Sequence, residues 1–314
     1  MWLLLAFLSA ALLGFYDVFK KESLKDNAVI TVLFLNTLFS SLIFLPFIII
    51  SATGTALDGT IFHVASGGWE MHKYIVLKSC IVLSSWIFGY FGMKHVPLTI
   101  YGPINATRPV MVLVGALLVF GEKLNAWQWV GVLLAIVSFF MLSKSAKKEH
   151  IDFKHDKWIY CIVAGAVLGA ASGLYDKYLM ASPANGGVGL DKMMVQSWYN
   201  IYQMFMMGII LLIAVKKPFA KYRGGKPLFP QTEFHWHWSI ILISVFLSAA
   251  DFVYFYSLSL DGAMISIVSM IRRGSVVVSF LFGALLFHEK NLKAKAVDLA
   301  FVLIGMVFLY IGSK

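Results

Sequence analysis

Long apolar segments dominate this 314-residue chain and limit what it can fold into. Hydrophobic residues make up 60% of the sequence and charged residues 13%, against about 25% charged residues in soluble domains. A span of about 20 apolar residues crosses a bilayer, and it must satisfy its own backbone polar groups, so such spans form helices. Ten apolar segments can be counted, over residues 2–19, 29–50, 74–91, 98–120, 127–142, 158–180, 194–215, 238–260, 262–287 and 295–311. We therefore predict an all-α integral membrane protein with ten transmembrane helices.

The second half of the chain repeats motifs of the first half. Gly-x-Tyr-Asp occupies residues 14–17 of the first segment and recurs at residues 173–176 of the sixth. Gly-Ala-Leu-Leu followed by Glu-Lys begins at residue 115 in the fourth segment and at residue 283 in the ninth. Each half thus holds five spans, in residues 1–145 and 152–314. Because five is odd, the second copy is inverted relative to the first, as in many secondary transporters that bind substrate near the midplane.

These duplicated motifs resemble the EamA-type transporters of the drug/metabolite transporter superfamily, and the resemblance covers the whole chain. It implies a ten-helix carrier whose central cavity is lined mainly by the third, fourth, eighth and ninth helices. It does not imply one substrate, because members of the family move amino acids, sugars, nucleotide derivatives, polyamines or drugs.

Arginines interrupt two of the apolar segments at corresponding depths. Arg108 precedes a proline in the fourth segment, and Arg272 and Arg273 precede a glycine in the ninth. An arginine at the bilayer centre costs at least about 2.5–3.5 kcal/mol, so it usually faces a bundle interior or an aqueous cavity. The arginines can bind a carboxylate or phosphate, or form structural ion pairs, for example with Asp251. Adjacent residues do not share a helix face, so we expect one of Arg272 and Arg273 to bind substrate while the other braces the helix.

Three acidic residues are candidates for coupling or gating. Asp17 and Asp176 are the repeated acids, and both lie beside lysines near the ends of their segments. They can anchor helix ends through local ion pairs, or they can bind a proton, because burial favours the neutral form of a carboxyl group. Asp251 lies deep in the eighth segment, where it is equally a coupling site and the natural counter-ion of Arg272.

Several other side chains are candidates for lining the same substrate site. They are Lys78 and Trp86 in the third segment, Tyr101 and Asn105 in the fourth, and Tyr254 and Tyr256 in the eighth. The first two lie on one helix face, and the others can supply hydrogen bonds. Aromatic residues in spans equally serve as simple packing.

The sequence predicts no catalytic activity, no cofactor and no metal site. It contains no phosphate-binding glycine loop, no zinc-ligand spacing and no catalytic triad pattern. The net charge of +10 comes mainly from lysines in loops, which indicates membrane topology rather than nucleic-acid binding. The expected partners are a small-molecule substrate, the lipid bilayer and, as one option, protons. The chain is expected to be a monomer or a homodimer.

The lysine distribution also predicts an orientation. Of the 26 lysines and arginines, seventeen fall in the loops on one side of the predicted bundle and four on the other. The positive-inside rule then places both termini outside the cytoplasm, in a multi-pass protein of the cell (inner) membrane. The resemblance to EamA-type transporters implies cytoplasmic termini instead.

We therefore expect secondary-active efflux or exchange of a small polar metabolite by alternating access. The substrate is expected to bear a carboxylate or phosphate group, because basic residues converge on the fourth and ninth segments. The alternative is a flippase for a lipid-linked or amphipathic substrate.

Overall fold

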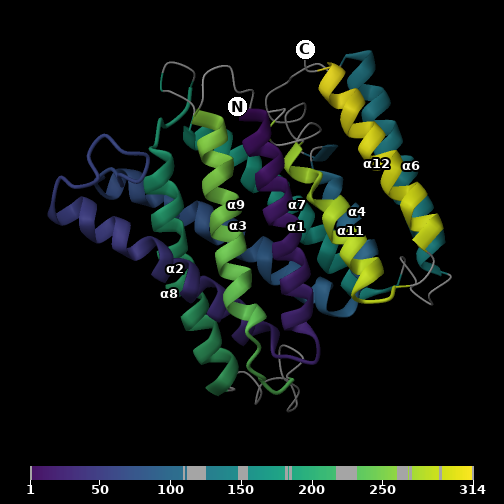
Figure 1. The fold of residues 1–314 in the computed structure, drawn as a ribbon, viewed down its shortest axis with the longest axis horizontal. Helices are drawn as coiled ribbons and strands as arrows, with labels where there is room; N and C mark the ends of the chain where they lie inside the picture. Colours follow the sequence, from purple (N-terminus) through teal and green to yellow (C-terminus); the bar gives the residue numbers. More distant parts are fainter. Residues whose placement is uncertain are drawn as a thin grey trace.

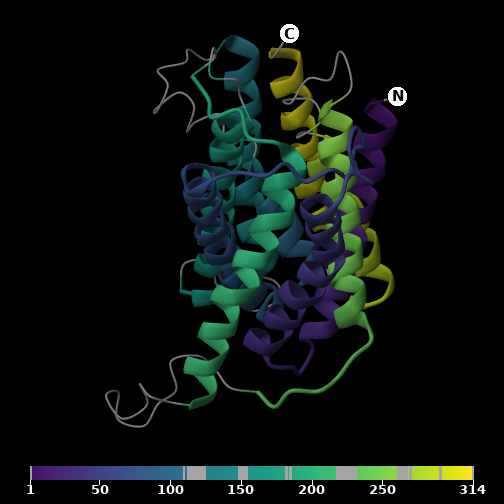
Figure 2. The same ribbon diagram turned by 90° about the vertical axis from the view of Figure 1, so that its left-hand side faces the viewer.

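The computed structural model forms a bundle of helices (Figure 1). It describes residues 2–108, 110–111, 125–147, 155–180, 183, 186–216, 232–259, 268, 271–289 and 292–312. Within these residues every extended regular element is a helix, as predicted. The first helix begins and the last helix ends at the same end of the bundle, as the views in Figures 1 and 2 agree.

Each predicted segment contains one described helix. The helices are α1 (Trp2–Leu24), α2 (Val29–Thr53), α3 (Trp69–His95), α4 (Leu98–Ala106), α6 (Ala126–Lys147), α7 (Lys157–Met180), α8 (Lys192–Lys216), α9 (Ser239–Ser259), α11 (Ser275–Leu285) and α12 (Leu292–Gly312). Several run past the predicted ends of the apolar segments, because a helix can continue through polar residues beyond its apolar stretch. Residues 109, 112–120, 260–267 and 269–270 of the predicted fourth, eighth and ninth segments lie outside the described residues.

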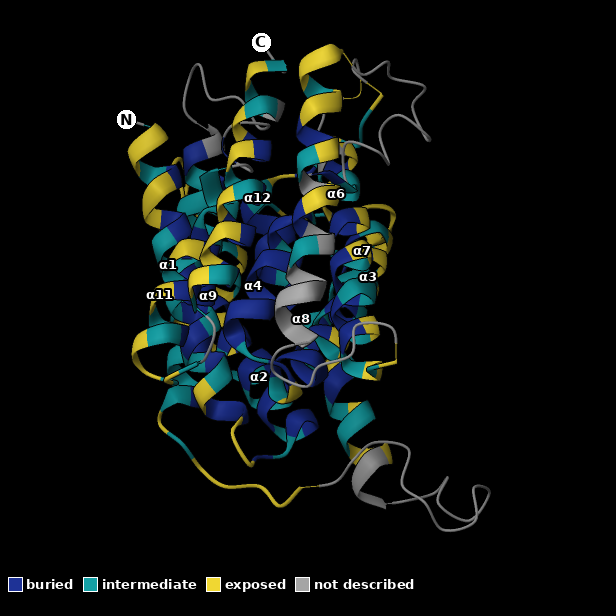
Figure 3. Ribbon diagram, turned by 90° about the vertical axis from the view of Figure 1, so that its right-hand side faces the viewer, coloured by how far each residue is buried: buried dark blue, intermediate teal, exposed yellow. Residues whose placement is uncertain are grey.

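The outer surface of the bundle is apolar. Among the described residues, six helices are long and apolar enough to cross a membrane, namely α1, α2, α3, α7, α9 and α12. Large apolar side chains point outward from the bundle, such as Leu4, Leu212 and Leu285, which are 75%, 59% and 68% exposed. Exposed residues follow the outward faces in Figure 3, while the interior helices are buried. Extended exposed apolar surface of this kind marks a contact with lipid, so the chain is a multi-pass membrane protein.

Helices from the two halves of the chain pack against each other in pairs. α1 packs along α9, α2 along α8, α3 along α7, α4 along α11, and α6 along α12. The first of these pairs is antiparallel. The Ser9 hydroxyl donates to the Ala250 carbonyl at 2.7 Å, and the hydroxyls of Ser23 and Ser239 lie 2.6 Å apart. Residue numbers thus rise along α1 as they fall along α9.

Two glycines allow close approach between helices. A Cβ atom on Gly14 would lie 2.4 Å from the Cβ of Val278, and one on Gly165 would lie 3.0 Å from the Ser85 carbonyl oxygen. Both distances are too short for a side chain, so α1 meets α11, and α7 meets α3, through these positions. Small residues commonly serve this purpose between membrane helices.

Candidate functional site

The arginines of the fourth and ninth segments lie where helices are interrupted. α4 ends at Ala106, two residues before Arg108, and α11 begins at Ser275, two residues after Arg273. A turn precedes α11, in which the Gly274 amide donates to the Ile271 carbonyl at 2.8 Å. The helix irregularity predicted at Gly274 is therefore present, and α4 ends just before Arg108. Pro109, where the other irregularity was predicted, lies outside the described residues.

The register of α4 against α11 brings these arginines together. A Cβ atom on Gly102 would meet the Val276 side chain at 2.6 Å, and one on Gly283 would meet Thr99 at 3.2 Å. This antiparallel register places Arg108 level with Arg272 and Arg273. All three guanidinium groups lie within range of direct electrostatic repulsion.

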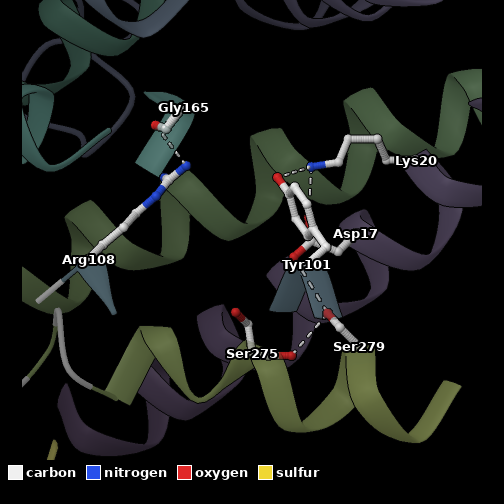
Figure 4. Close-up of polar contacts among 7 residues, drawn as sticks. All are labelled: Asp17, Lys20, Tyr101, Arg108, Gly165, Ser275 and Ser279. Carbon is white, nitrogen blue, oxygen red and sulfur yellow. Dashed lines mark hydrogen bonds and ion pairs between the residues drawn. The ribbon is translucent and has the colours of Figure 1, made fainter. Parts of the chain in front are cut away.

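Arg108 lies against α7 (Figure 4). Its Nη2 atom donates to the Gly165 carbonyl at 3.3 Å, and its buried Nε atom has no hydrogen-bond partner. A Cβ atom on Gly169 would lie 2.6 Å from the Arg108 Cζ atom. The absence of a side chain at Gly169 thus provides the space that the guanidinium group occupies.

Arg272 is held by an acid and an aromatic ring. It forms an ion pair with Asp251, and its guanidinium carbon lies 4.4 Å from the centre of the Tyr254 ring. The other carboxylate oxygen of Asp251 accepts a hydrogen bond from the Tyr199 hydroxyl at 3.0 Å. The expectation that Asp251 is the counter-ion of Arg272 is confirmed.

Arg273 has different surroundings from its neighbour. It is half-buried, and it makes no hydrogen bond or ion pair in the described part of the chain. The nearest charged groups include Arg108 and Arg272, which repel it, and Asp17, which attracts it. Arg272 is thus the braced arginine, and Arg273 has no partner among the described residues.

Asp17 pairs within its own helix (Figure 4). Its Oδ1 atom lies 2.8 Å from Lys20 Nζ, and its Oδ2 atom lies 3.5 Å from the Ser279 hydroxyl. Lys20 Nζ also lies 3.5 Å from the Tyr101 hydroxyl. The same ammonium group lies 4.3 Å from the centre of the Tyr16 ring, a cation–π contact that stabilises a buried cation.

Asp176 pairs with a lysine from another helix. Its carboxylate forms an ion pair with Lys78 of α3. The side chain of its sequence neighbour Lys177, the predicted local partner, lies outside the described residues. Lys78 Nζ lies 5.4 Å from the centre of the Tyr199 ring. Tyr199 therefore contacts both the Asp176–Lys78 pair and the Asp251–Arg272 pair.

The remaining predicted residues are half-buried within the bundle. Trp86 packs against two apolar clusters of the core. Tyr256 stacks on Phe252 with their ring centres 6.5 Å apart. Asn105 lies one turn beyond the buried Tyr101 on α4.

Three interior residues were missed from the sequence. Tyr199 gave no signal, because a tyrosine in a span usually indicates packing. Lys20 was counted as a loop residue, as was Lys295, yet these residues are only 3% and 0% exposed. That assignment was wrong because α1 and α12 extend past the apolar segments that marked their ends. The available clue for Lys20 was its spacing of three residues from Asp17, because residues at that spacing on a helix can form an ion pair.

The connection between α3 and α4 is held by charged side chains from other helices. Lys21 Nζ donates to the carbonyl oxygens of Met93 and Val96, each at 2.7 Å. The Glu289 carboxylate accepts hydrogen bonds from the amides of Leu98 and Thr99 at 2.6 and 2.9 Å. A cation thus caps the end of α3 and an anion caps the start of α4, as the helix dipole favours.

The site is built from charged and tyrosine side chains. Among the described residues, no group of three His, Cys, Asp or Glu side chains is placed to hold a metal ion. The arrangement can bind anions through guanidinium groups and can hold protons on paired carboxylates.

Comparisons with known proteins agree with this architecture. Residues 1–144 match the EamA-like transporter family. An uncharacterized transporter from Archaeoglobus fulgidus is 24% identical over 149 residues, which are 46% of this chain and 49% of that protein. The match thus spans about half the length of that relative. A crystal structure covers 99% of this chain and is itself covered to 96%, with a TM-score of 0.63 and 11% identity, which shows a shared fold.

The family match in the first half, the transporter-named relative and the apolar helices lead to one conclusion. The chain is a multi-pass membrane protein whose first half, residues 1–144, matches the EamA-like transporter family.

Proposed function

We propose that this chain is a secondary-active transporter that exports or exchanges a small anionic metabolite by alternating access. The observation that carries the proposal is the pair Arg108 and Arg273, which come from corresponding segments of the two halves and are placed at the same level by the register of α4 against α11. An arginine inside a membrane bundle normally has a partner or lines a substrate path. The planar guanidinium group suits a carboxylate or phosphate group best.

The proposal includes ten helices in two inverted repeats, residues 1–145 and 152–314. Its support is an exchange of packing partners. An offset of 159 residues carries the Gly-x-Tyr-Asp motif of α1 onto that of α7, and α1 packs on α9 as α7 packs on α3. The pairs α2 with α8 and α6 with α12 join each helix to its own counterpart. A two-fold axis in the membrane plane generates both kinds of pair.

Proton coupling, if the transporter uses it, is best assigned to Asp176. Asp251 is already occupied as the counter-ion of Arg272, which is permanently charged, and it also accepts a hydrogen bond from the Tyr199 hydroxyl. The Asp176 side chain is 26% exposed, against 13% for Asp251 and 14% for Asp17. Asp176 is thus the most accessible of the three acids to water, and its partner is a flexible lysine. Asp17 is then the corresponding gating residue in the other half.

Six further side chains complete the proposed substrate site. They are Lys78, Trp86, Tyr101, Asn105, Tyr254 and Tyr256. The polar groups among them, together with the interior arginines, suit a polar substrate better than an acyl chain. We therefore prefer a soluble metabolite over the lipid-linked substrate of a flippase.

We place both termini outside the cytoplasm, in the inner membrane. Removing the interior residues Lys20 and Lys295 from the seventeen basic residues of the lysine-rich side leaves fifteen, against four on the other side. The positive-inside rule still favours the lysine-rich side as cytoplasmic. A C-terminal reporter that is active only in the cytoplasm tests this orientation, and activity of that reporter contradicts it.

Transport by purified protein tests the proposed function. Untargeted metabolomics of cells with and without the protein first selects an anionic candidate. Its uptake into proteoliposomes is then measured with and without a proton gradient. We expect Arg108→Ala and Arg273→Ala each to reduce uptake by roughly tenfold or more, the effect of losing one charge-assisted contact, while Lys25→Ala, on an exposed lysine, does not. If both arginine variants keep normal transport and affinity, the proposed site is wrong.

A further inference from the structure

The charges inside the bundle are largely neutralised in pairs. Asp251 neutralises Arg272, Lys20 neutralises Asp17, and Lys78 neutralises Asp176. Each pair consists of one cation and one anion, so together they add no net charge. Any net charge at the site must come from groups outside these pairs.

Arg108 and Arg273 are outside the pairs. Within the described part of the chain, Arg108 donates to the Gly165 carbonyl, which is neutral, and its buried Nε atom has no hydrogen-bond partner there. Arg273 forms no ion pair within the described ranges, and Arg108 and Arg272 repel it. Guanidinium groups do not lose their protons in proteins. Among the residues that the structure describes, these two therefore leave the site with two positive charges.

Two like charges in a membrane interior are costly because neither is solvated by bulk water. Charges buried without a counter-ion destabilise a protein, and nearby charges of the same sign add to the cost. A ligand with one negative charge would neutralise only one of them. The ammonium group of a zwitterion would find no free acid in Asp17, Asp176 or Asp251, since each of these carboxylates already has a cation.

We infer that this site takes a substrate with two negative charges, one bound by Arg108 and the other by Arg273. The substrate class is thus a dianion, such as a phosphate monoester or a dicarboxylate, and not a monocarboxylate or an amino acid. This inference rests on the proposed function, since it assigns the charge of the ligand that the same site carries. Arg272 serves as the support that holds the segment before α11 in place.

Matched pairs of anions test the inference on the full chain in lipid nanodiscs. Sulfate and methyl sulfate differ in charge but share the same oxyanion chemistry, and succinate and succinamate form a longer pair of the same kind. Binding of each anion is measured by calorimetry at constant ionic strength, set with chloride. We expect at least one dianion to bind roughly tenfold or more tightly than its singly charged partner, the difference that one charge-assisted contact makes.

Variants assign the two charges to the two arginines. We expect Arg108→Gln and Arg273→Gln each to abolish the preference for the dianion, so that both members of a pair bind equally weakly. Arg108→Lys and Arg273→Lys retain the charge and should retain the preference, even with weaker binding. Lys25→Gln removes one positive charge from an exposed position in the loop between α1 and α2. It should leave the preference for the dianion unchanged.

The outcomes separate this inference from the proposed function. Equal binding of both members of each pair, with loss of binding in the arginine variants, overturns the dianion inference and keeps the anion site. Binding that is unaffected by either arginine, or no binding of any of the four anions, overturns both.

Discussion

Arg272 and Arg273 are adjacent in sequence but differ in what surrounds their side chains. Removing Arg272 leaves the Asp251 carboxylate without its cation, and breaking one partner of a buried pair costs about 3–5 kcal/mol. Removing Arg273 instead relieves repulsion from Arg108 and Arg272. We expect Arg272→Gln to lower the unfolding temperature and Arg273→Gln to leave it unchanged or raise it, as measured by thermal unfolding in detergent.

The double variant Arg272→Gln/Asp251→Asn is the control for this comparison. It removes both charges of the pair and should recover part of the stability lost in Arg272→Gln. A larger loss from Arg273→Gln than from Arg272→Gln would contradict the assignment of Arg272 as the brace.

Gly169 determines where the Arg108 guanidinium group lies. An alanine at this position would place its Cβ 2.6 Å from Arg108 Cζ, and the end of a long side chain can move away at little cost. We expect Gly169→Ala to weaken sulfate binding severalfold while unfolding changes by less than about 1 kcal/mol. Gly165→Ala provides the contrast, because its Cβ would meet the backbone of Ser85 and Gly89 at 3.0 and 3.2 Å and should lower stability. Unchanged sulfate binding in Gly169→Ala would show that Arg108 does not bind from this position.

The sequence predicted the interior arginines, and it offered Asp251 as the counter-ion of Arg272, but it did not decide which of Arg272 and Arg273 is the brace. Their position in apolar segments was sufficient to identify Arg108, Arg272 and Arg273, because such residues are costly without a purpose. The choice between the last two depends on how α9 is rotated toward the segment before α11, which no local pattern encodes. The pairing of Asp176 with Lys78 was missed for the same reason, since the lysine comes from a different helix.

At the scale of helices, Glu289 anchors the start of α4 from the turn that follows α11. The residue before it, His288, has a positive φ of 47°, a conformation that non-glycine residues rarely adopt. The Glu289 carboxylate accepts hydrogen bonds from the amides of Leu98 and Thr99. Loss of a helix cap costs about 0.5–2 kcal/mol. We expect Glu289→Ala to let the start of α4 open more often.

Cysteine labelling measures that opening. In a background of Cys80→Ala and Cys161→Ala, Leu98→Cys places a thiol at a position that is 0% exposed. A cost of 1–2 kcal/mol should speed its reaction with a maleimide by roughly five- to thirtyfold. Glu22→Ala removes an exposed acid from the last turn of α1 and should not change the rate of maleimide labelling. Equal rates in the Glu289→Ala and Glu22→Ala proteins would count against the cap.

Helix positions were the part of the fold that the sequence predicted best. Each apolar segment overlaps one described helix, and six of these helices are long and apolar enough to cross a membrane, because length and apolar content determine a membrane span. The ends were less accurate. α1 continues through Lys20 to Leu24 because Asp17 and tyrosine rings stabilise that lysine inside the bundle, and a hydrophobicity count registers only the charge.

At the scale of the whole molecule, the main contacts of most described helices lie in the other half of the chain. α1 packs chiefly on α9, α3 on α7, and α6 on α12. Fragments 1–145 and 152–314 should therefore be unstable when each is produced alone. When they are co-expressed, we expect a tag on one fragment to recover the other as a complex of one copy each, measured by affinity purification and size-exclusion chromatography. Stable, monodisperse single fragments would contradict this expectation.

The pairing of α1 with α9 also has a consequence for the timing of synthesis. The ribosome adds about 5–20 residues per second, and α9 begins at Ser239 whereas α1 ends at Leu24. α1 must therefore wait roughly 10–40 seconds for its principal partner. During that interval Ser9 and Ser23, which later bond to α9, have no α9 to meet. The insertion machinery or a chaperone must bind this polar edge of α1 until α9 has been synthesised.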